Sequence, residues 1–225
     1  MAEISPSVDT PAYYSVAFWR RWARLYDRVV TLSFLPFGGE KHFRRKFVAL
    51  TELKADDRVL DICCGTGSTT AIIAPEVDQG HVTGVDLSPD MLAVARKKVV
   101  APWVSYQNAS VDALPFGDKS FDNVICSYGL HEIPEKIRLA AIKEAFRVLK
   151  SGGKFLILDY HLPRRFPARQ AIGAFVRIFE HDIAYRMMKG DLTKEMTAAG
   201  FNVQFKKEAL GGMFQIILSV KEGKR

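Results

Sequence analysis

A glycine-rich turn between two acidic residues is the part of this sequence best suited to hold a ligand. Residues 59–70 read VLDICCGTGSTT, in which an apolar run ends near Asp61, and Gly65 and Gly67 occupy the turn that follows. A second apolar run, VTGVD, ends at Asp86. Glycines let backbone N–H groups approach a ligand closely, and a carboxylate at the end of the next strand can accept both hydroxyls of a ribose. The spacing predicts a site for a nucleoside-like cofactor.

Two classes of cofactor fit this order of strand, turn, helix, strand and acid: a dinucleotide and S-adenosylmethionine. A dinucleotide site uses the glycines of G-x-G-x-x-G for a tight turn and for close packing of the helix. Here Cys63 stands at the first position and Thr70 at the third. A carboxylate beside the turn, such as Asp61, also suits the ammonium group of S-adenosylmethionine. The residues therefore favour S-adenosylmethionine over a nicotinamide dinucleotide.

The adjacent cysteines Cys63 and Cys64 raise the alternative of a metal or redox site. With Cys126 they are three cysteines in all, and the five histidines form no ligand pattern with them, so neither a metal site nor a disulfide framework is predicted. We expect Cys64 to pack its side chain beneath the turn, with its backbone toward the ligand. Because Cys63 replaces a glycine of the usual turn, its φ is not expected to be positive. Free cysteines suit a reducing cytoplasm, which is the expected location.

The elements that would position these residues alternate along the chain. From residue 58 to residue 160, short β-branched apolar runs are followed by helical patterns, which is typical of a parallel sheet covered by helices on both faces. Ser88 and Pro89 suit the start of one of these helices, and the glycines after Lys150 suit the end of another. The predicted fold class is doubly wound α/β.

Further elements are expected at both ends of this sheet. Helical patterns cover residues 12–33 and 39–51, so we expect an N-terminal helical lid or acceptor segment over residues 1–50 and a core over 51–225. Within the core, an insertion after the fifth strand, at about 161–199, is expected to shape the acceptor site, and two paired strands follow it. The apolar face expected on this insertion comprises Ile172, Phe175, Val176, Phe179 and Ile183.

Four segments, in chain order, resemble the class I S-adenosylmethionine-dependent methyltransferases: VLDICCGTGSTT, VTGVDLSPDMLAVARKK, DALPFGDKSFDNVICSYGLHEIP and FRVLKSGGKFLILDY. Within that class the chain is most similar to the ubiquinone/menaquinone biosynthesis C-methyltransferase family, in which CCGTG, LPFxDxSFD, SxGL and RVLKxGG occur together. YDRVVTLSF and MTAAGF extend the likeness over residues 26 to 220 or so. The resemblance implies a Rossmann-like, mostly parallel seven-stranded sheet. It also implies S-adenosylmethionine as cofactor and S-adenosylhomocysteine as product.

Carried over position by position, the resemblance implies where the cofactor lies. Its amino-acid end would meet the glycine turn, its ribose and adenine edge would meet the second acidic position, and its sulfonium would lie beside SxGL. The adenine amino group would lie near Ser110, where the family often has Asp or Asn. The cofactor-binding residues so implied are Asp61, Cys64, Gly65, Gly67, Asp86, Leu87, Ser110, Val111 and Ser127.

Methyl transfer from a sulfonium is an in-line displacement, so the protein must align the acceptor in a dry pocket. A carbon or hydroxyl acceptor also needs a base of near-neutral pKa. His131, at the end of a strand, is the first candidate, and Glu132 adjoins it. Asp159 and His161 are the next candidates. The alternative is that His131 caps the next helix or lines the pocket, and the family usually has Arg-Asn at this place, so its ring chemistry does not transfer automatically.

The basic and aromatic residues bear on partners. The net charge is +7, with basic clusters in the flanks such as residues 44–46, and FWRRWARLYDRVV interleaves arginines with apolar residues. That composition suits an interfacial helix on anionic lipid. Alternatively, the apolar stripe packs as a lid over the cofactor, and Tyr26 would be a pocket wall in either case. Nucleic acid is not expected as a substrate, because no NPPY-like segment follows the fourth strand.

The leading hypothesis is therefore methylation of a lipophilic small molecule, with C-methylation of a prenylated quinone as the specific expectation. Two alternatives stay open. One is N-methylation of an amine such as a phospholipid headgroup, which needs less help from a base. The other is a protein that binds the cofactor without catalysis. The expected location is cytoplasmic, with peripheral attachment to a membrane if the N-terminal helix is interfacial.

Overall fold

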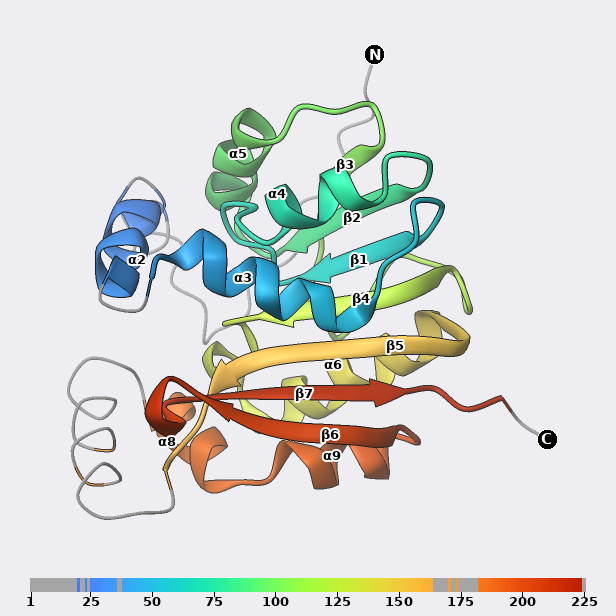
Figure 1. Cartoon of the computed structure of the whole chain (residues 1–225). Coiled ribbons are helices and arrows are strands. Elements are labelled where there is room, and N and C mark those ends of the chain that lie inside the picture. The colour runs from blue at the N-terminus through green and yellow to red at the C-terminus, as the bar shows by residue number, and fades with distance from the viewer. Residues whose placement is uncertain are drawn as a thin grey trace.

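The computed structural model describes residues 20, 23, 25–35, 38–163, 170, 173 and 182–223. Its centre is a seven-stranded sheet with the order β3-β2-β1-β4-β5-β7-β6 (Figure 1). Strands β1 to β5 pair in parallel, and β7 runs antiparallel to β5 and β6. The predicted fold class and strand number are confirmed. The strands are β1 (Arg58–Ile62), β2 (His81–Asp86), β3 (Val104–Asn108), β4 (Phe121–Ser127), β5 (Leu149–Tyr160), β6 (Asn202–Ala209) and β7 (Phe214–Val220).

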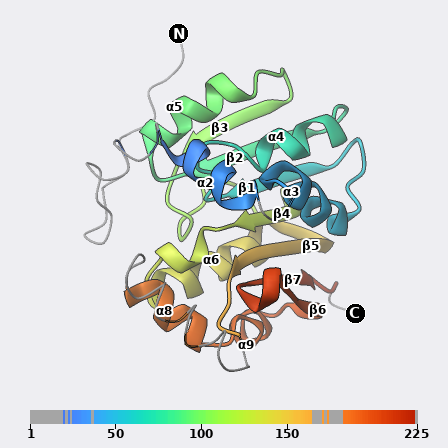
Figure 2. The same ribbon diagram turned by 60° about the vertical axis from the view of Figure 1, so that its left-hand side comes forward.

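Helices cover both faces of the sheet, with α3 and α4 over one face and α6 and α9 over the other (Figures 1 and 2). The α-helices of the described residues are α2 (Tyr26–Phe34), α3 (Glu40–Val48), α4 (Thr70–Ile73), α5 (Pro89–Lys98), α6 (Glu135–Val148), α8 (Asp182–Lys189) and α9 (Leu192–Ala198). Short 3-10 turns are η2 (Ala49–Thr51), η3 (Ala74–Glu76), η4 (Leu130–Glu132) and η5 (Leu210–Gly212). None of the described helices is both long and apolar enough to cross a membrane.

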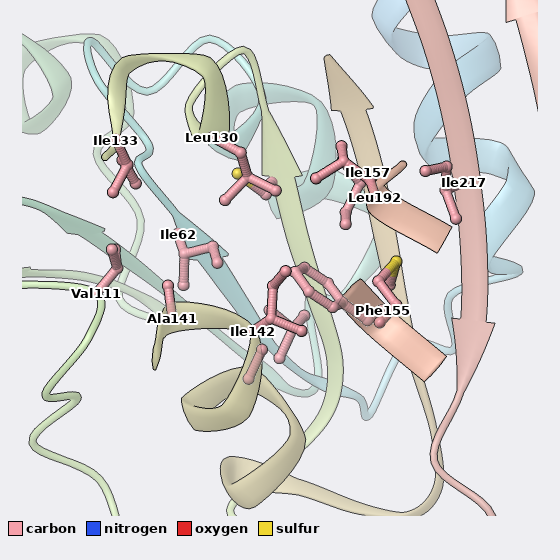
Figure 3. Close-up of a cluster of buried hydrophobic side chains, with 14 of the residues drawn as sticks. Ile62, Val111, Leu130, Ile133, Ala141, Ile142, Phe155, Ile157, Leu192 and Ile217 are labelled. Carbon is pink, nitrogen blue, oxygen red and sulfur yellow. The ribbon is translucent and has the colours of Figure 1, made fainter. Parts of the chain in front are cut away.

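The apolar residues of the central strands divide between two buried clusters. Leu60 and Ile62 of β1 belong to the cluster beneath α6 and α9, whereas Val59 belongs to the cluster beneath α3 and α4. Figure 3 shows Ile62 and Phe155 of the first cluster near Ile142 of α6. Because successive strand side chains point to opposite faces, an unbroken apolar run is buried on both faces. This burial on both faces stabilises the paired strands of the sheet.

The carboxyl ends of β1, β2 and β4 meet at one edge of the sheet, and α2 lies beyond that edge (Figure 1). The turn after β2 leads into α5 through the predicted cap. Ser88 Oγ accepts a hydrogen bond from the N–H of Met91 at 3.2 Å, and Pro89 is the first helical residue. The residues predicted to bind the cofactor follow these strand ends, so the topology gathers them at this edge.

Two boundaries differ from the sequence prediction. The helix expected to reach Lys150 is α6, which ends at Val148, and β5 already begins at Leu149. Leu149 pairs with Phe121 of β4, so strand pairing ends the helix before the residues to which the helical pattern alone would extend it. The helix expected over 39–51 is α3 followed by the 3-10 turn η2.

The segments before and after the central sheet are described in part. Of the helix expected over residues 12–33, α2 is described, whereas residues 12–19 lie outside the described residues. Of the apolar face expected on the insertion, Ile183 of α8 is described and the other four members lie outside. Helix α9 packs against α6 and β6, and its Met196 is fully buried, so this end of the insertion covers the sheet. The predicted close pair of final strands is confirmed as β6 and β7.

Candidate active site

A cavity of about 340 Å³ opens at the carboxyl edge of the sheet. The glycine turn and the ends of β2 and β4 form one side of it, while α2, α3 and α8 contribute Tyr26, Arg44 and Ile183. Most of the predicted site residues line this cavity together. They are Tyr26, Cys64, Gly65, Asp86, Leu87, Ser110, Val111, Ser127 and Glu132. The other three, Asp61, Gly67 and His131, are not part of its lining.

The glycine turn needs three residues in the left-handed region. Cys63, Gly65 and Gly67 have φ angles of 54°, 55° and 75°. The expectation that Cys63 would avoid positive φ is therefore wrong. The chain must reverse directly after β1 so that the N–H of Cys64 can donate to Val85 O of β2 at 3.0 Å. A non-glycine residue in such a conformation costs roughly 1–3 kcal/mol, and strain of this kind gathers at functional sites.

The two glycines of the turn serve different purposes. A Cβ at Gly65 would meet no atom within 4 Å, so the absent side chain leaves room on the cavity side. A Cβ at Gly67 would lie 3.0 Å from both Ala95 Cβ and Tyr106 Oη. Gly67 therefore allows close packing of the turn against α5 and β3. Of the two, Gly65 is the glycine that allows a ligand to approach the backbone.

Cys64 packs as the sequence led us to expect. It is 8% exposed, and a Cβ added at Gly84 of β2 would lie 3.0 Å from its Sγ. Burial, and then the nearby Asp86, raise the pKa of the Cys64 thiol well above its usual value, so the thiol stays neutral. In the part of the chain that the structure describes, no group of three or more His, Cys, Asp or Glu residues could hold a metal ion.

Asp61 is a fully buried carboxylate beneath the turn. Its Oδ2 accepts a hydrogen bond from Thr70 Oγ1 at 2.6 Å, while its Oδ1 has no hydrogen-bond partner. Burial raises the pKa of Asp61 to about 7, against the opposing hydrogen bond from Thr70. An unsatisfied buried oxygen is costly. A cation bound above the turn would therefore stabilise the charged form of this carboxyl, as the ammonium end of S-adenosylmethionine could.

Asp86 ends β2 with its carboxylate held from the backbone. Oδ2 accepts from the N–H of Gly65 and Oδ1 accepts from the N–H of Ser88, each at 2.8 Å. Each carboxylate oxygen has a second lone pair, so both can still accept a ribose hydroxyl. Asn108 Nδ2 donates to the carbonyls of Asp86 and Leu87 at 3.0 Å each, which steadies the same edge. The predicted adenine contact Ser110 lines the cavity and donates to Asp112.

His131 is buried between two carboxylates. Its Nδ1 lies 2.6 Å from Asp159 Oδ1, and its Nε2 lies 3.4 Å from Glu132 Oε1. Asp159 Oδ2 also accepts from the N–H of Leu130 at 2.8 Å, which ties η4 to β5. Burial opposes the charge on His131, but Asp159 and Glu132 outweigh it and raise the pKa of the imidazole well above its usual value. Of this pair, Glu132 lines the cavity and His131 does not.

Arg44 belongs to the basic cluster at residues 44–46, for which no role in the site was predicted, and it lines the cavity. Arg45 and Lys46 are exposed, but Arg44 is 3% exposed. It forms an ion pair with Glu40 one helical turn earlier, at 2.6 Å between Nε and Oε1. The sequence signal that could have found it is this Glu–Arg pair at a spacing of four, directly after two glycines.

Helix α2 is tied across the glycine turn by side chains. Thr66 Oγ1 donates to Asp27 Oδ1 at 2.6 Å, and Lys98 Nζ at the end of α5 lies 2.7 Å from Asp27 Oδ2. Lys98 Nζ also donates to Ser68 Oγ at 3.0 Å. These contacts set Tyr26, the residue before Asp27, in the cavity wall. α2 therefore covers the turn on the side from which a ligand would approach.

Known proteins that resemble this chain are methyltransferases. A family model described as a methyltransferase domain matches residues 59–153, from β1 into β5. An uncharacterized methyltransferase of Synechocystis sp. (strain ATCC 27184 / PCC 6803 / Kazusa) is 33% identical over 193 residues, which are 86% of this chain and 89% of that protein. The likeness thus extends well beyond the glycine turn.

A relative whose name states a substrate matches a smaller part of this chain. The demethylmenaquinone methyltransferase of Lactiplantibacillus plantarum is 36% identical over 143 residues, 61% of this chain and 59% of that enzyme. The chain thus spans less than two thirds of that enzyme's length. The crystal structure of an S-adenosylmethionine-dependent methyltransferase from Aquifex aeolicus covers 92% of this chain and 99% of its own, with a TM-score of 0.62 at 18% identity. At that identity the likeness concerns the fold.

Proposed function

Because the chain belongs to the class I S-adenosylmethionine-dependent methyltransferases, we propose that it methylates a ring carbon of a lipophilic quinol bearing a prenyl chain. The observation that carries this proposal is the 36% identity to a demethylmenaquinone methyltransferase over 143 residues. The cavity supports it, because Tyr26, Tyr128, Ile133 and Ile183 give its wall apolar and aromatic surface.

The residues present fit the cofactor. When bound, S-adenosylmethionine supplies a methyl group on a positively charged sulfur. We assign the ribose hydroxyls to Asp86, whose oxygens keep free lone pairs beside the open space at Gly65. Ser110, Val111 and Ser127 line the same cavity, and we assign the first two to the adenine side and Ser127 to the methionine side. The unpartnered oxygen of buried Asp61 lies beneath the same turn and favours a cationic ligand above it.

We assign proton removal to Glu132. As the acceptor carbon takes the methyl group, whose former bonding pair would stay with sulfur, its ring proton would leave for the Glu132 carboxylate. His131 holds Glu132 by its Nε2 and is itself held by Asp159. In this proposal His131 is a positioning residue, and the role of base that the sequence suggested for it belongs to its neighbour. Tyr26 bounds the acceptor space from α2.

Incubation with labelled S-adenosylmethionine and reduced demethylmenaquinone tests the proposal. The expected result is a labelled quinol whose mass has risen by one methylene unit. A lipid extract run in parallel distinguishes the alternatives. Label in the amine of a phospholipid headgroup would contradict C-methylation. Tight binding of S-adenosylhomocysteine with no labelled product from any lipid would point to a protein that binds the cofactor without catalysis.

We further propose that the outer face of α2 contacts an anionic lipid surface, from which a lipophilic acceptor would reach the cavity. Apolar side chains recur at intervals of three or four residues along this face, and Arg28 lies among them by helical spacing. They are Leu25, Val29, Leu32 and Leu35, with 50%, 41%, 65% and 61% of their surface exposed. The net charge of +7 complements such a surface. The helix predicted from the sequence also contains three aromatic residues that lie outside the described residues, Phe18, Trp19 and Trp22.

Sedimentation with vesicles of phosphatidylglycerol and phosphatidylcholine tests this surface. Replacing Leu32 and Leu35 together by serine should reduce the bound fraction several-fold, because apolar area is lost from the contact. The matched control is Val100→Ser, which removes an apolar side chain that is 86% exposed and does not belong to α2. Equal binding by both variants would contradict the proposed surface.

A further inference from the structure

Arg44 of α3 is a buried cation in the wall of the cavity. An arginine in such surroundings is costly unless its charge and its N–H groups are matched. Among the described residues that line the cavity, Arg44 carries the one positive charge, opposite the carboxylates of Asp86 and Glu132. A cation kept at a mostly negative wall indicates a ligand with a negative group at that position.

Three sides of the guanidinium are already held. Nε donates to Glu40 Oε1 at 2.6 Å, and Nη1 donates to Thr69 Oγ1 at 2.6 Å and to Ser127 Oγ at 2.9 Å. The centroid of the Tyr128 ring lies 5.1 Å from Arg44 Cζ, so one face is covered. Burial opposes the charge, but Glu40 outweighs it and the pKa of Arg44 is raised. The group is therefore charged, and its orientation is set before any ligand arrives.

Nη2 is the third nitrogen of the Arg44 guanidinium. Within the described chain it donates no hydrogen bond, and it is not among the polar atoms sealed off in the interior without a partner. An N–H group of a guanidinium pairs well with a carboxylate oxygen. Glu40 does not fill this role, because its Oε1 accepts from the neighbouring Nε.

We infer that Arg44 binds the α-carboxylate of S-adenosylmethionine and of S-adenosylhomocysteine through Nη2. Its partners Thr69 and Ser127 come from the glycine turn and the end of β4, on the methionine side of the cavity. Asp61, whose charge interacts with that of Arg44, lies beneath the same turn. A buried cation and a buried carboxylate would then receive the two opposite charges of one α-amino acid. The inference concerns the cofactor and is independent of which acceptor is methylated.

Isothermal titration calorimetry with three ligands tests this inference. S-Adenosylhomocysteine has the carboxylate, its decarboxylated form keeps only the ammonium group, and 5′-methylthioadenosine lacks both. The native protein should bind S-adenosylhomocysteine roughly 10- to 100-fold more tightly than the decarboxylated form, as a charged hydrogen bond implies. In Arg44→Gln that preference should vanish, with the affinities for the other two ligands unchanged.

The control is Arg45→Gln, which removes the exposed neighbouring arginine and should keep the preference. Arg44→Gln leaves Glu40 without its partner, so the double variant with Glu40→Gln serves if the single variant does not fold. Equal affinities of the native protein for S-adenosylhomocysteine and its decarboxylated form would overturn the inference with no variant needed. An equal loss for all three ligands in folded Arg44→Gln would also overturn it, because that result marks a purely structural role.

Discussion

The cavity has two walls of different construction. The sheet wall, formed by the turns after β1, β2 and β4, is held mainly by the backbone, and Asp86 accepts from two backbone N–H groups. The helix wall, formed by α2 and α3, is held mainly by side chains, as Asp27 and Arg44 are. Strand pairing positions backbone groups whatever the side chains are, whereas a wall held by a few side-chain contacts loses a contact when one of those side chains is replaced. The sheet wall should therefore keep its shape alone, and the helix wall should respond to single substitutions.

Glu132→Gln should have the largest effect, and it should fall on catalysis and leave the sheet wall intact. Removing a general base lowers the rate by roughly 10²- to 10⁴-fold. Affinity for S-adenosylhomocysteine should stay unchanged, because Glu132 lies at the acceptor side of the proposed site. Single-turnover methylation of reduced demethylmenaquinone measures the rate, and calorimetry measures the binding. A fall in both quantities together would mean that the two walls are not separable.

Asp61 makes cofactor binding depend on pH. With a pKa of about 7 in the ligand-free protein, it binds a proton that a cationic ligand would expel, so the complex holds fewer protons. Affinity for S-adenosylhomocysteine should therefore rise with pH up to about 7, by at most about tenfold per unit, and then level off. Calorimetry across this range should give a flat profile for Asp61→Asn. A native profile that is flat, or that falls, would contradict this role.

The Asp61 carboxyl should make the stability of the ligand-free protein fall with rising pH, whereas it makes the affinity for the cofactor rise. Its folded pKa of about 7 lies above the value of about 4 expected in the unfolded chain. Unfolding therefore releases a proton between these pH values, and the stability of the ligand-free protein should fall as pH rises through that window. Asp61→Asn should lack this fall, as thermal unfolding at several pH values would measure.

Asp27→Asn probes the helix wall. It weakens the contacts to Lys98 and Thr66 that hold α2 across the turn, so S-adenosylhomocysteine should bind roughly two- to fivefold more weakly. The contribution is small because the Asp27 side chain is 38% exposed. Arg28→Gln, on the outer face of the same helix, is the matched control and should bind normally. Equal binding by both variants would show that α2 does not complete the wall.

Cys64→Ser should have the smallest effect on binding. The side chain is buried beneath the turn, and we expect its backbone to border the ligand, so affinity for S-adenosylhomocysteine should change by less than about twofold. The buried hydroxyl should lower the free energy of unfolding by about 1–3 kcal/mol, which thermal unfolding would detect. Complete loss of methyl transfer in a folded variant would mean that the thiol itself takes part in the chemistry.

The sequence predicted the sheet wall better than the helix wall, for a physical reason. Residues such as Asp86 and Ser127 end apolar strands, and parallel strands bring their carboxyl ends to one edge. Arg44 gave no such signal, since its burial depends on how α3 lies against the turn. His131 was a predicted site residue, but its contact of 2.6 Å with Asp159 joins residues 28 positions apart, so the sequence could not show it.

The sequence by itself determined the fold class and the cofactor and predicted a turn to bind it, because alternation of strands and helices and the positions of glycines and acids are local properties. Tertiary structure alone decided which of two adjacent residues, His131 or Glu132, reaches the cavity, and that Cys63 must take a positive φ. It also decided that Arg44 is buried while Arg45 is not. Burial, the pKa values and the strain of the turn all depend on neighbours supplied by distant segments.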